Sequence, residues 1–191
     1  SPNSLRRIDD KMRITTGKYR NRKIMMPKGI RPTQDKVRKA IFDILGDIEE
    51  ASFLELFAGS GAVGFEALSR GAGEVVMVES GHEQYACIRR NASSLGAGSC
   101  NIYYLDAEKA VRVLCGDGKR FDIVFLDPPY SKGMAKKILH TLEGYDILSP
   151  NGLVLVQHSR EESLPGSSPK FSLIKEAKYG DTWISIFRKE G

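Results

Sequence analysis

A glycine-rich segment between an apolar run and a helical pattern constrains the fold of this chain more than any other feature. The run FLELF at 53–57 leads into GSGAVG at 59–64, and a helical pattern continues to Gly71. A GxGxxG motif between a strand and a helix is typical of nucleotide-binding βα units, because its glycines let the backbone approach a ligand closely. The segment therefore predicts the first unit of a doubly wound α/β fold. The alternative is a tight βα turn that binds no ligand.

The chain after this segment repeats the alternation of strands and helices. Apolar runs predict strands at 74–79, 101–105, 121–127 and 152–158, separated by helical patterns at 83–95, 107–114 and 133–145. Such a series predicts a mostly parallel sheet with ligands bound outside the carboxyl ends of its strands. Two further strands at 170–179 and 182–189 have only a short turn between them, so they predict a terminal hairpin.

The N-terminal part of the chain differs from the rest in charge. Residues 1–40 hold 13 Lys/Arg and 3 Asp/Glu, a net charge of +10, whereas the whole chain carries +5. Residues 12–26 are predicted to form a β-hairpin, and residues 31–45 a helix with Thr33 as its N-cap. A basic arm on an acidic body favours a polyanionic partner, most simply nucleic acid, over an arm that only meets solvent. The candidate RNA-binding residues are Arg13, Lys18, Arg20, Arg22, Lys23 and Arg31.

Composition excludes several classes of protein. Hydrophobic residues make up 41% and charged residues 28% of the chain, as in ordinary soluble domains. No apolar run approaches the roughly 20 residues of a membrane helix, and no secretory pattern is visible, so we expect a cytoplasmic protein. Three widely spaced cysteines without a CxxC motif predict reduced thiols and no metal site. We expect residues 1–11 to be a tag or disordered.

Acidic residues stand at the strand ends where a ligand is expected. Glu55 precedes the glycines, Glu79 ends the second strand, and Asp106 ends the third. Glu79 is placed to hold both hydroxyls of a ribose, and Asp106 can accept from an adenine amino group or cap the next helix. Glu55 suits a ligand that carries an ammonium and a sulfonium better than it suits the phosphates of NAD. The pattern therefore favours S-adenosylmethionine. The candidate cofactor-binding residues are Glu55, Phe57, Ala58, Gly59, Ser60, Gly61, Gly64, Glu79, Ser80, Asp106 and Ala107.

The segment FLDPPY at 125–130 carries the predicted catalytic chemistry. Two prolines directly after a buried strand end its ladder and stiffen the turn. The Asp127 carboxylate and the Pro128 carbonyl can then accept the two N–H groups of an exocyclic amine on a base, while Tyr130 stacks on the ring. The candidate catalytic residues are Asp127, Pro128, Pro129 and Tyr130.

These motifs together resemble one family. FAGSG followed by DPPY is similar to the amino-directed S-adenosylmethionine methyltransferases of nucleic acids. A more specific resemblance, over about residues 12–188, is to the RsmD family of 16S rRNA guanine-N2 methyltransferases. It is carried by three successive segments, which are the basic MRITTGKYRNRKI, then RPTQDKVRKAIFDIL, then ELFAGSGAVGFEALSRGA. The resemblance implies a Rossmann-like class I methyltransferase with a seven-stranded, mostly parallel sheet and an antiparallel last strand. It also implies that a basic hairpin extension at 12–30 precedes a methyltransferase domain at 31–191.

The resemblance implies methyl transfer from S-adenosylmethionine to the N2 of a guanine in 16S rRNA, in the small ribosomal subunit or a late assembly intermediate. It implies no metal, and no obligate protein partner is evident. An adenine-N6 methyltransferase acting on RNA or DNA stays open as an alternative. So does a non-catalytic RNA-binding or assembly protein on a methyltransferase scaffold, although the intact acidic, glycine and DPPY motifs speak against it.

Overall fold

The computed structural model describes residues 11–28, 35–130, 133–166 and 168–190. The helices are α1 (Asp35–Leu45), α2 (Ala62–Ser69), α3 (His82–Leu95), α4 (Ala107–Gly116) and α5 (Met134–Gly144). The main sheet consists of β3 (Ser52–Leu56), β4 (Glu74–Glu79), β5 (Cys100–Tyr104), β6 (Phe121–Leu126), β7 (Leu148–Ser159), β8 (Phe171–Tyr179) and β9 (Thr182–Lys189). Two short strands, β1 (Lys11–Arg13) and β2 (Lys23–Met25), pair separately near the N-terminus.

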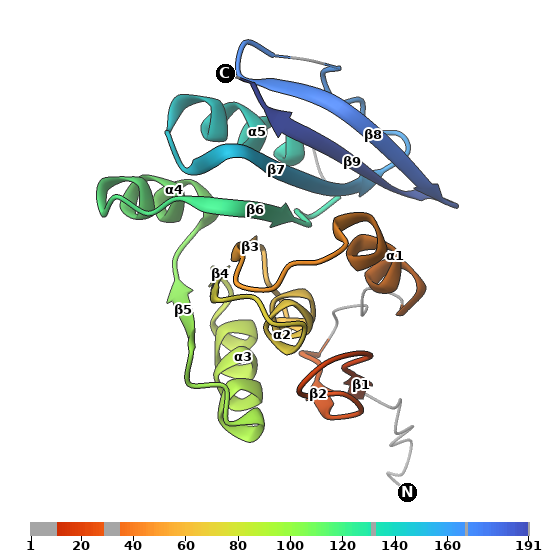
Figure 1. Cartoon of the computed structure of the whole chain (residues 1–191), viewed down its shortest axis with the longest axis vertical. Coiled ribbons are helices and arrows are strands. Elements are labelled where there is room, and N and C mark those ends of the chain that lie inside the picture. The colour runs from red at the N-terminus through yellow and green to blue at the C-terminus, as the bar shows by residue number, and fades with distance from the viewer. Residues whose placement is uncertain (1–10, 29–34, 131–132, 167, 191) are drawn as a thin grey trace, which may run out of the picture.

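The seven strands of the main sheet lie in the order β5-β4-β3-β6-β7-β9-β8 (Figure 1). Strands β3 to β7 pair in parallel, whereas β9 runs antiparallel to both of its neighbours. The predicted doubly wound sheet with a reversed last strand is therefore confirmed. The strand order reverses between β3 and β6, and this switch point is where open α/β sheets bind ligands.

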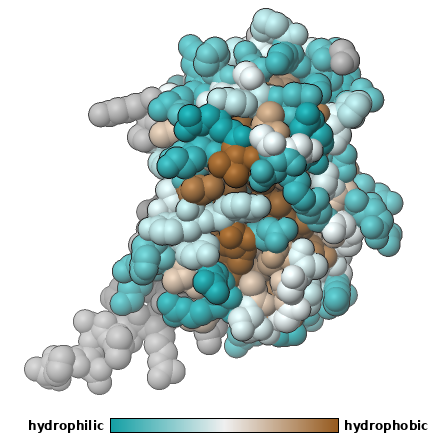
Figure 2. Space-filling model, turned by 90° about the vertical axis from the view of Figure 1, so that its left-hand side faces the viewer, coloured by the Kyte–Doolittle hydropathy of each residue, from teal (hydrophilic) through white to brown (hydrophobic). Residues whose placement is uncertain are grey.

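Helices cover both faces of the sheet, which explains the nearly continuous apolar character of its central strands. Because neighbouring residues of a strand point to opposite faces, Phe53 and Phe125 join one core with α1, α2 and α3. Leu54 and Leu126 join a second core with α4 and α5. On the face shown in Figure 2, hydrophobic residues gather in the hollowed middle between hydrophilic margins.

Strand β7 differs most from its predicted bounds. It begins at Leu148 instead of residue 152, and its pairing with β6 has a register shift between Phe121 and Ile123. The segment before Gly152 contains Pro150 and the positive-φ residue Asn151, which interrupt the apolar pattern. Leu148 pairs with Phe121, and regular pairing with β6 resumes at Leu153. A bulge of this kind accommodates residues that a regular strand pattern excludes.

The predicted N-terminal hairpin forms, with strands of three residues each, and the first strand already includes Lys11. A buried polar network around Glu66 of α2 fixes the hairpin on the domain. Glu66 accepts hydrogen bonds from the Thr15 backbone N–H and the Thr15 hydroxyl, both at 2.9 Å. Its two carboxylate oxygens also pair with Arg38 Nε at 3.3 Å and Arg70 Nε at 3.2 Å. The arm is thus an integral part of the packed structure.

The hairpin turn also fits closely against the end of α2. Gly17 has a φ of +90°, and a Cβ on it would lie 1.9 Å from the carbonyl oxygen of Ser69. The same carbonyl accepts from the Lys18 N–H at 2.8 Å, and the Ser69 hydroxyl accepts from the Tyr19 N–H at 2.8 Å. Only glycine combines this backbone conformation with so close an approach.

Candidate active site

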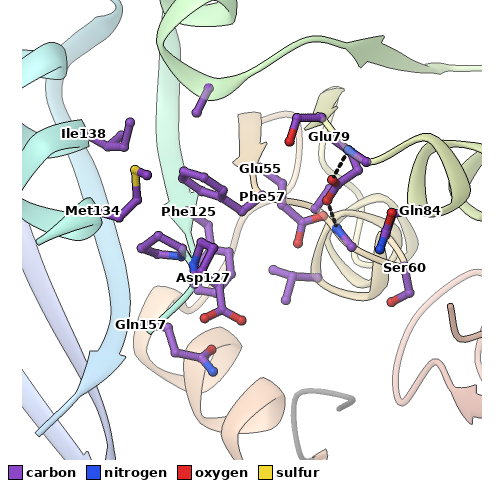
Figure 3. A pocket seen from close by; sticks show the side chains of 18 of the residues that line it. Glu55, Phe57, Ser60, Glu79, Gln84, Phe125, Asp127, Met134, Ile138 and Gln157 are labelled. Atoms are coloured by element: carbon purple, nitrogen blue, oxygen red, sulfur yellow. Dashed lines mark hydrogen bonds between the residues drawn. The ribbon is translucent and has the colours of Figure 1, made fainter. Parts of the chain in front are cut away.

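A pocket of about 1120 Å³ lies at the carboxyl ends of β3, β4, β5, β6 and β7, at the predicted edge of the sheet. The four predicted catalytic residues line it together with most of the predicted cofactor residues. The latter are Glu55, Phe57, Ala58, Gly59, Ser60, Glu79, Ser80, Asp106 and Ala107. Figure 3 shows Glu79 and Gln84 on one side of the pocket, Asp127 and Gln157 on the other, and Glu55 and Phe57 between them. One cavity therefore joins the two predicted halves of the site.

Glu79 is held in place by the backbone of two loops. Its Oε1 accepts from the Gly59 N–H at 2.9 Å and its Oε2 from the Gly81 N–H at 2.7 Å, the two bonds dashed in Figure 3. Gly59 itself has a φ of +61°, which suits glycine in this tight turn. Each carboxylate oxygen keeps a second lone-pair direction for a ligand hydroxyl. Glu79 is thus a fixed acceptor in the pocket wall.

Glu55 is the most deeply buried acid of the site, with 3% of its surface exposed. Burial raises its pKa well above the ordinary value, the N–H of Gly64 lowers it through a hydrogen bond of 3.2 Å, and the charges of Asp127 and Glu79 raise it further. A cation in the pocket would favour the ionised form of this carboxyl. Glu55 is therefore a buried acid whose ionisation a cationic ligand would promote.

Two predicted cofactor glycines do not line the pocket. Gly61 begins α2 with a φ of +81°, and a Cβ on it would lie 2.6 Å from the Phe65 ring. Gly64 lies inside α2, where a Cβ would meet the Met77 sulfur at 2.6 Å. Both glycines let α2 pack closely against the sheet. They therefore affect the pocket indirectly, through the position of α2, and do not contact its interior.

Asp106 lies at a helix end that also borders the pocket. Its Oδ1 caps α4 by accepting from the Lys109 N–H at 2.8 Å, and the residue also borders the pocket. Capping stabilises the helix and holds the side chain in one orientation. The second carboxylate oxygen is thus presented at a fixed place beside Ala107.

The DPPY segment forms the opposite wall of the pocket. Protein atoms surround the Asp127 carboxyl, and this desolvation raises its pKa to about 7. Pro128 is buried and Pro129 exposed, which fits a stiff turn that leaves the sheet. Tyr130 is 58% exposed, and its hydroxyl lies 3.5 Å from Thr182 Oγ1. An exposed ring beside a desolvated carboxyl suits a flat base that enters from outside.

Several pocket residues were missed by the sequence analysis. They are Met26, Val37, Ala62, Val63, Gly81, Gln84, Glu108, Phe125, Met134, Lys137, Ile138, Gln157 and Thr182. Met134, Lys137 and Ile138 lie on one face of α5 at helical spacing. This spacing indicates that their side chains share one side of the helix, but it does not indicate a pocket. Gln157 is the polar residue that directly follows the apolar run LVLV of β7, and this was the one available signal for it.

The basic residues of the hairpin lie on its outside. Arg13, Lys18, Arg20, Arg22 and Lys23 are all exposed, whereas Arg31 lies outside the described residues, as does the predicted N-cap Thr33. The hairpin adjoins the pocket because Met26, one residue after β2, lines it. The hairpin turn itself packs at the C-terminal end of α2, and Arg22 Nη2 donates to the Ser94 carbonyl at the C-terminal end of α3. The exposed cations of the hairpin are available to a polyanion.

Asn91 of α3 connects the hairpin to the glycine-rich loop. Its Oδ1 accepts from the Met25 N–H at 2.9 Å, and its Nδ2 donates to the carbonyls of Met25 and Ser60, each at 3.0 Å. Asn91 is 2% exposed, so these bonds are shielded from water. The hairpin and the pocket loop are thereby held in a fixed relation.

The described residues contain neither a membrane-spanning helix nor a cluster of metal-binding side chains. None of the described helices is both long and apolar enough to cross a membrane. Three or more His, Cys, Asp or Glu side chains in a metal-binding arrangement were likewise not found among residues 11–28, 35–130, 133–166 and 168–190.

Comparison with known proteins identifies the family. Residues 12–188 match the family model described as "Conserved hypothetical protein 95". The chain is 33% identical to "Ribosomal RNA small subunit methyltransferase D" of Escherichia coli K12, over 94% of this chain and 90% of that protein. It is 32% identical to the protein of the same name from Haemophilus influenzae, over 88% and 89% of the two chains.

The fold agrees with this relationship. The solved structure of "Putative methyltransferase yhhF from Escherichia coli" superposes with a TM-score of 0.83 at 32% identity, and the match covers 94% of this chain and 98% of that one. These similarities, which extend over nearly the whole length of the chain, show that it belongs to the RsmD family and has its class I methyltransferase fold.

Proposed function

We propose that this protein transfers a methyl group from S-adenosylmethionine to the exocyclic N2 of a guanine in 16S rRNA. The observation that carries the proposal is that one pocket contains both the acid-lined edge of β3, β4 and β5 and the DPPY segment after β6. A cofactor on the first part and a base on the second would meet inside the same cavity. The names of the relatives support ribosomal RNA of the small subunit as the substrate.

The pocket residues fit S-adenosylmethionine better than a pyrophosphate cofactor. Glu55 is a buried carboxyl whose pKa burial raises, and the positive charge of the cofactor would favour its ionised form. Glu79 would hold the ribose hydroxyls, and Asp106 the adenine amino group. When bound, the cofactor supplies an electrophilic methyl group on a sulfonium. The residues of the chain orient the cofactor and the acceptor, and this alignment provides much of the acceleration.

Asp127 and Pro128 would act on the acceptor amine. Its lone pair is delocalised into the ring, so the amine is a poor nucleophile. Acceptors for both N–H groups draw the nitrogen toward a tetrahedral geometry with an available lone pair. The Asp127 carboxylate also stabilises the positive charge that grows on the nitrogen. Tyr130, whose side chain is exposed, would stack on the base, as aromatic side chains do with unstacked bases.

The basic hairpin would position the RNA. Its five described cations are exposed, and contacts of such side chains with phosphates fix the register of a nucleic acid without reading its bases. We propose the small ribosomal subunit or a late assembly intermediate as the substrate particle, and the cytoplasm as the place of reaction.

The experiment that tests this proposal uses small-subunit particles from a strain that lacks the endogenous enzyme. The particles are incubated with the protein and labelled S-adenosylmethionine, and the rRNA is digested to nucleosides for mass spectrometry. The proposal predicts N2-methylguanosine. N6-methyladenosine would favour the adenine-directed alternative, and no methylated nucleoside would favour a non-catalytic RNA-binding protein.

A further inference from the structure

Gln157 of β7 is a buried polar side chain in the pocket that the proposed reaction has not used. It is 6% exposed, and it lines the cavity. Among the described residues its Oε1 has no hydrogen-bond partner. A buried acceptor without a partner is costly, and such a group in a native structure calls for an explanation. At the wall of a pocket, the direct explanation is a ligand that supplies the partner.

The position of Gln157 ties it to the base-binding half of the pocket. Strands β6 and β7 run parallel with Leu126 opposite Val156, so Asp127 and Gln157 follow at the same level of neighbouring strands. Residues in register on parallel strands point to the same face of the sheet. Figure 3 shows the Gln157 carboxamide below the Asp127 carboxylate, across the pocket from Glu79. A base whose amine meets Asp127 would therefore meet Gln157 with the adjoining part of its ring.

We propose that Gln157 is a specificity-determining residue that reads the Watson–Crick edge of the target guanine. The inference rests on the proposed function, because it takes the guanine amine to lie at Asp127. Beside its 2-amino group guanine presents the N1–H donor and then the O6 acceptor. A carboxamide offers the complementary pair, an oxygen that accepts and an NH₂ that donates, and rotation about its last bond turns either toward the base.

The same contact discriminates against adenine. An adenine whose 6-amino group lies at Asp127 presents the N1 acceptor beside the amine and no further donor or acceptor along that edge. It would satisfy one half of the Gln157 carboxamide and leave the other half without a partner. Loss of a bidentate hydrogen-bond pair to a base reduces the discrimination between the correct and the wrong base by roughly 5- to 150-fold. Gln157 thus adds selectivity for guanine to a loop that accepts any exocyclic amine.

The experiment measures the contact by changing both of its partners. The substrate is a small subunit reconstituted with 16S rRNA that carries either guanine or 2-aminopurine at the site methylated by the unaltered protein. 2-Aminopurine keeps the reacting amine but lacks the N1–H and the O6. The proteins are the unaltered chain, Gln157→Met, which keeps the length of the side chain, and Gln157→Ala. The readouts are kcat/KM for each base and calorimetric binding of S-adenosylhomocysteine.

We expect the unaltered protein to prefer guanine over 2-aminopurine by about tenfold or more, within the range for a two-fold base contact. In both Gln157 variants this ratio should fall to within about threefold of unity, while affinity for S-adenosylhomocysteine stays within about twofold of the unaltered protein, because the cofactor contacts lie on other residues. Retained cofactor affinity also shows that the variants are folded. Gln84→Met is the matched control, since it makes the same chemical change on the opposite wall and should keep the preference for guanine.

A guanine preference that survives in both Gln157 variants would overturn the inference and leave the proposed function intact. An unaltered protein that methylates guanine and 2-aminopurine equally well would overturn it too. If the unaltered protein produced N6-methyladenosine, the proposed function would fail first, and the inference would fall with it.

Discussion

The network around Glu66 predicts that loss of one buried charge lowers the stability of the protein, because this network holds the basic hairpin on the domain. Glu66 is completely buried and joins three segments that lie far apart in the sequence: Thr15 in the hairpin, Arg38 in α1 and Arg70 after α2. Glu66→Gln preserves the shape of the side chain and removes its charge. The guanidinium of Arg38, 1% exposed, then loses its buried counterion.

The magnitude of this effect follows from the burial of both partners. Removal of one partner from a buried ion pair costs about 3–5 kcal/mol, and we expect the lower part of that range, about 3–4 kcal/mol, because glutamine keeps some of the hydrogen bonds. In a domain of this size about 1 kcal/mol lowers Tm by roughly 2–4 °C, so Tm should fall by roughly 6–16 °C. The assay is thermal unfolding followed by circular dichroism, with urea unfolding as an independent measure of the free energy.

Asp35→Asn is the matched control, because Asp35 also pairs with Arg38, at 3.0 Å, but is 72% exposed. An exposed pair contributes at most about 1 kcal/mol, so this variant should stay close to the unaltered protein. Equal effects of the two substitutions would refute the reasoning that burial makes Glu66 important. A Glu66→Gln variant as stable as the unaltered protein would show that the network does not hold the hairpin.

Four further predictions concern the site and the hairpin. Asp127→Ala should abolish most methyl transfer and leave affinity for S-adenosylhomocysteine within about twofold, since this side chain is proposed to touch only the amine; equal losses of both would contradict that role. Burial raises the pKa of Asp127 to about 7 and the ionised form accepts the N–H, so kcat/KM should fall as pH decreases through about 7, and a flat profile would exclude the carboxylate. Glu79→Ala should weaken S-adenosylhomocysteine binding by about 1–3 kcal/mol in calorimetry, and NAD binding instead would refute the cofactor assignment. Replacement of Arg20, Arg22 and Lys23 with Ala should weaken RNA binding and flatten its salt dependence by somewhat under one unit of slope per lost phosphate contact, with cofactor binding unchanged; an unaltered slope would remove the hairpin from RNA recognition.

The fold was predictable from the sequence because its signals are local. The pattern EVVMVE gave the bounds of β4 without error at 74–79, and the glycine-rich turn identified the ligand-binding edge. Strand β7 was predicted too short, because Leu148 pairs with β6 ahead of a register shift that no local pattern encodes.

The features that were not predicted depend on contacts between distant segments. Glu66 looks like an ordinary helix-surface charge in the sequence, and its partners Thr15 and Arg38 lie 51 and 28 residues away along the chain. Gln157 lies beside Asp127 only because β7 pairs with β6, and the alternation of strands and helices does not specify this pairing. Local patterns reveal elements, whereas buried polar residues acquire their roles from the topology.

The central claim is that one pocket brings a methyl donor to the N2 of a guanine in rRNA of the small subunit. Nucleoside mass spectrometry of small-subunit rRNA treated with the protein and labelled S-adenosylmethionine tests this claim most directly, with Asp127→Ala as the inactive control. The account predicts labelled N2-methylguanosine at one site, absent with the Asp127 variant. Label in N6-methyladenosine, or no label with the unaltered protein, would contradict it.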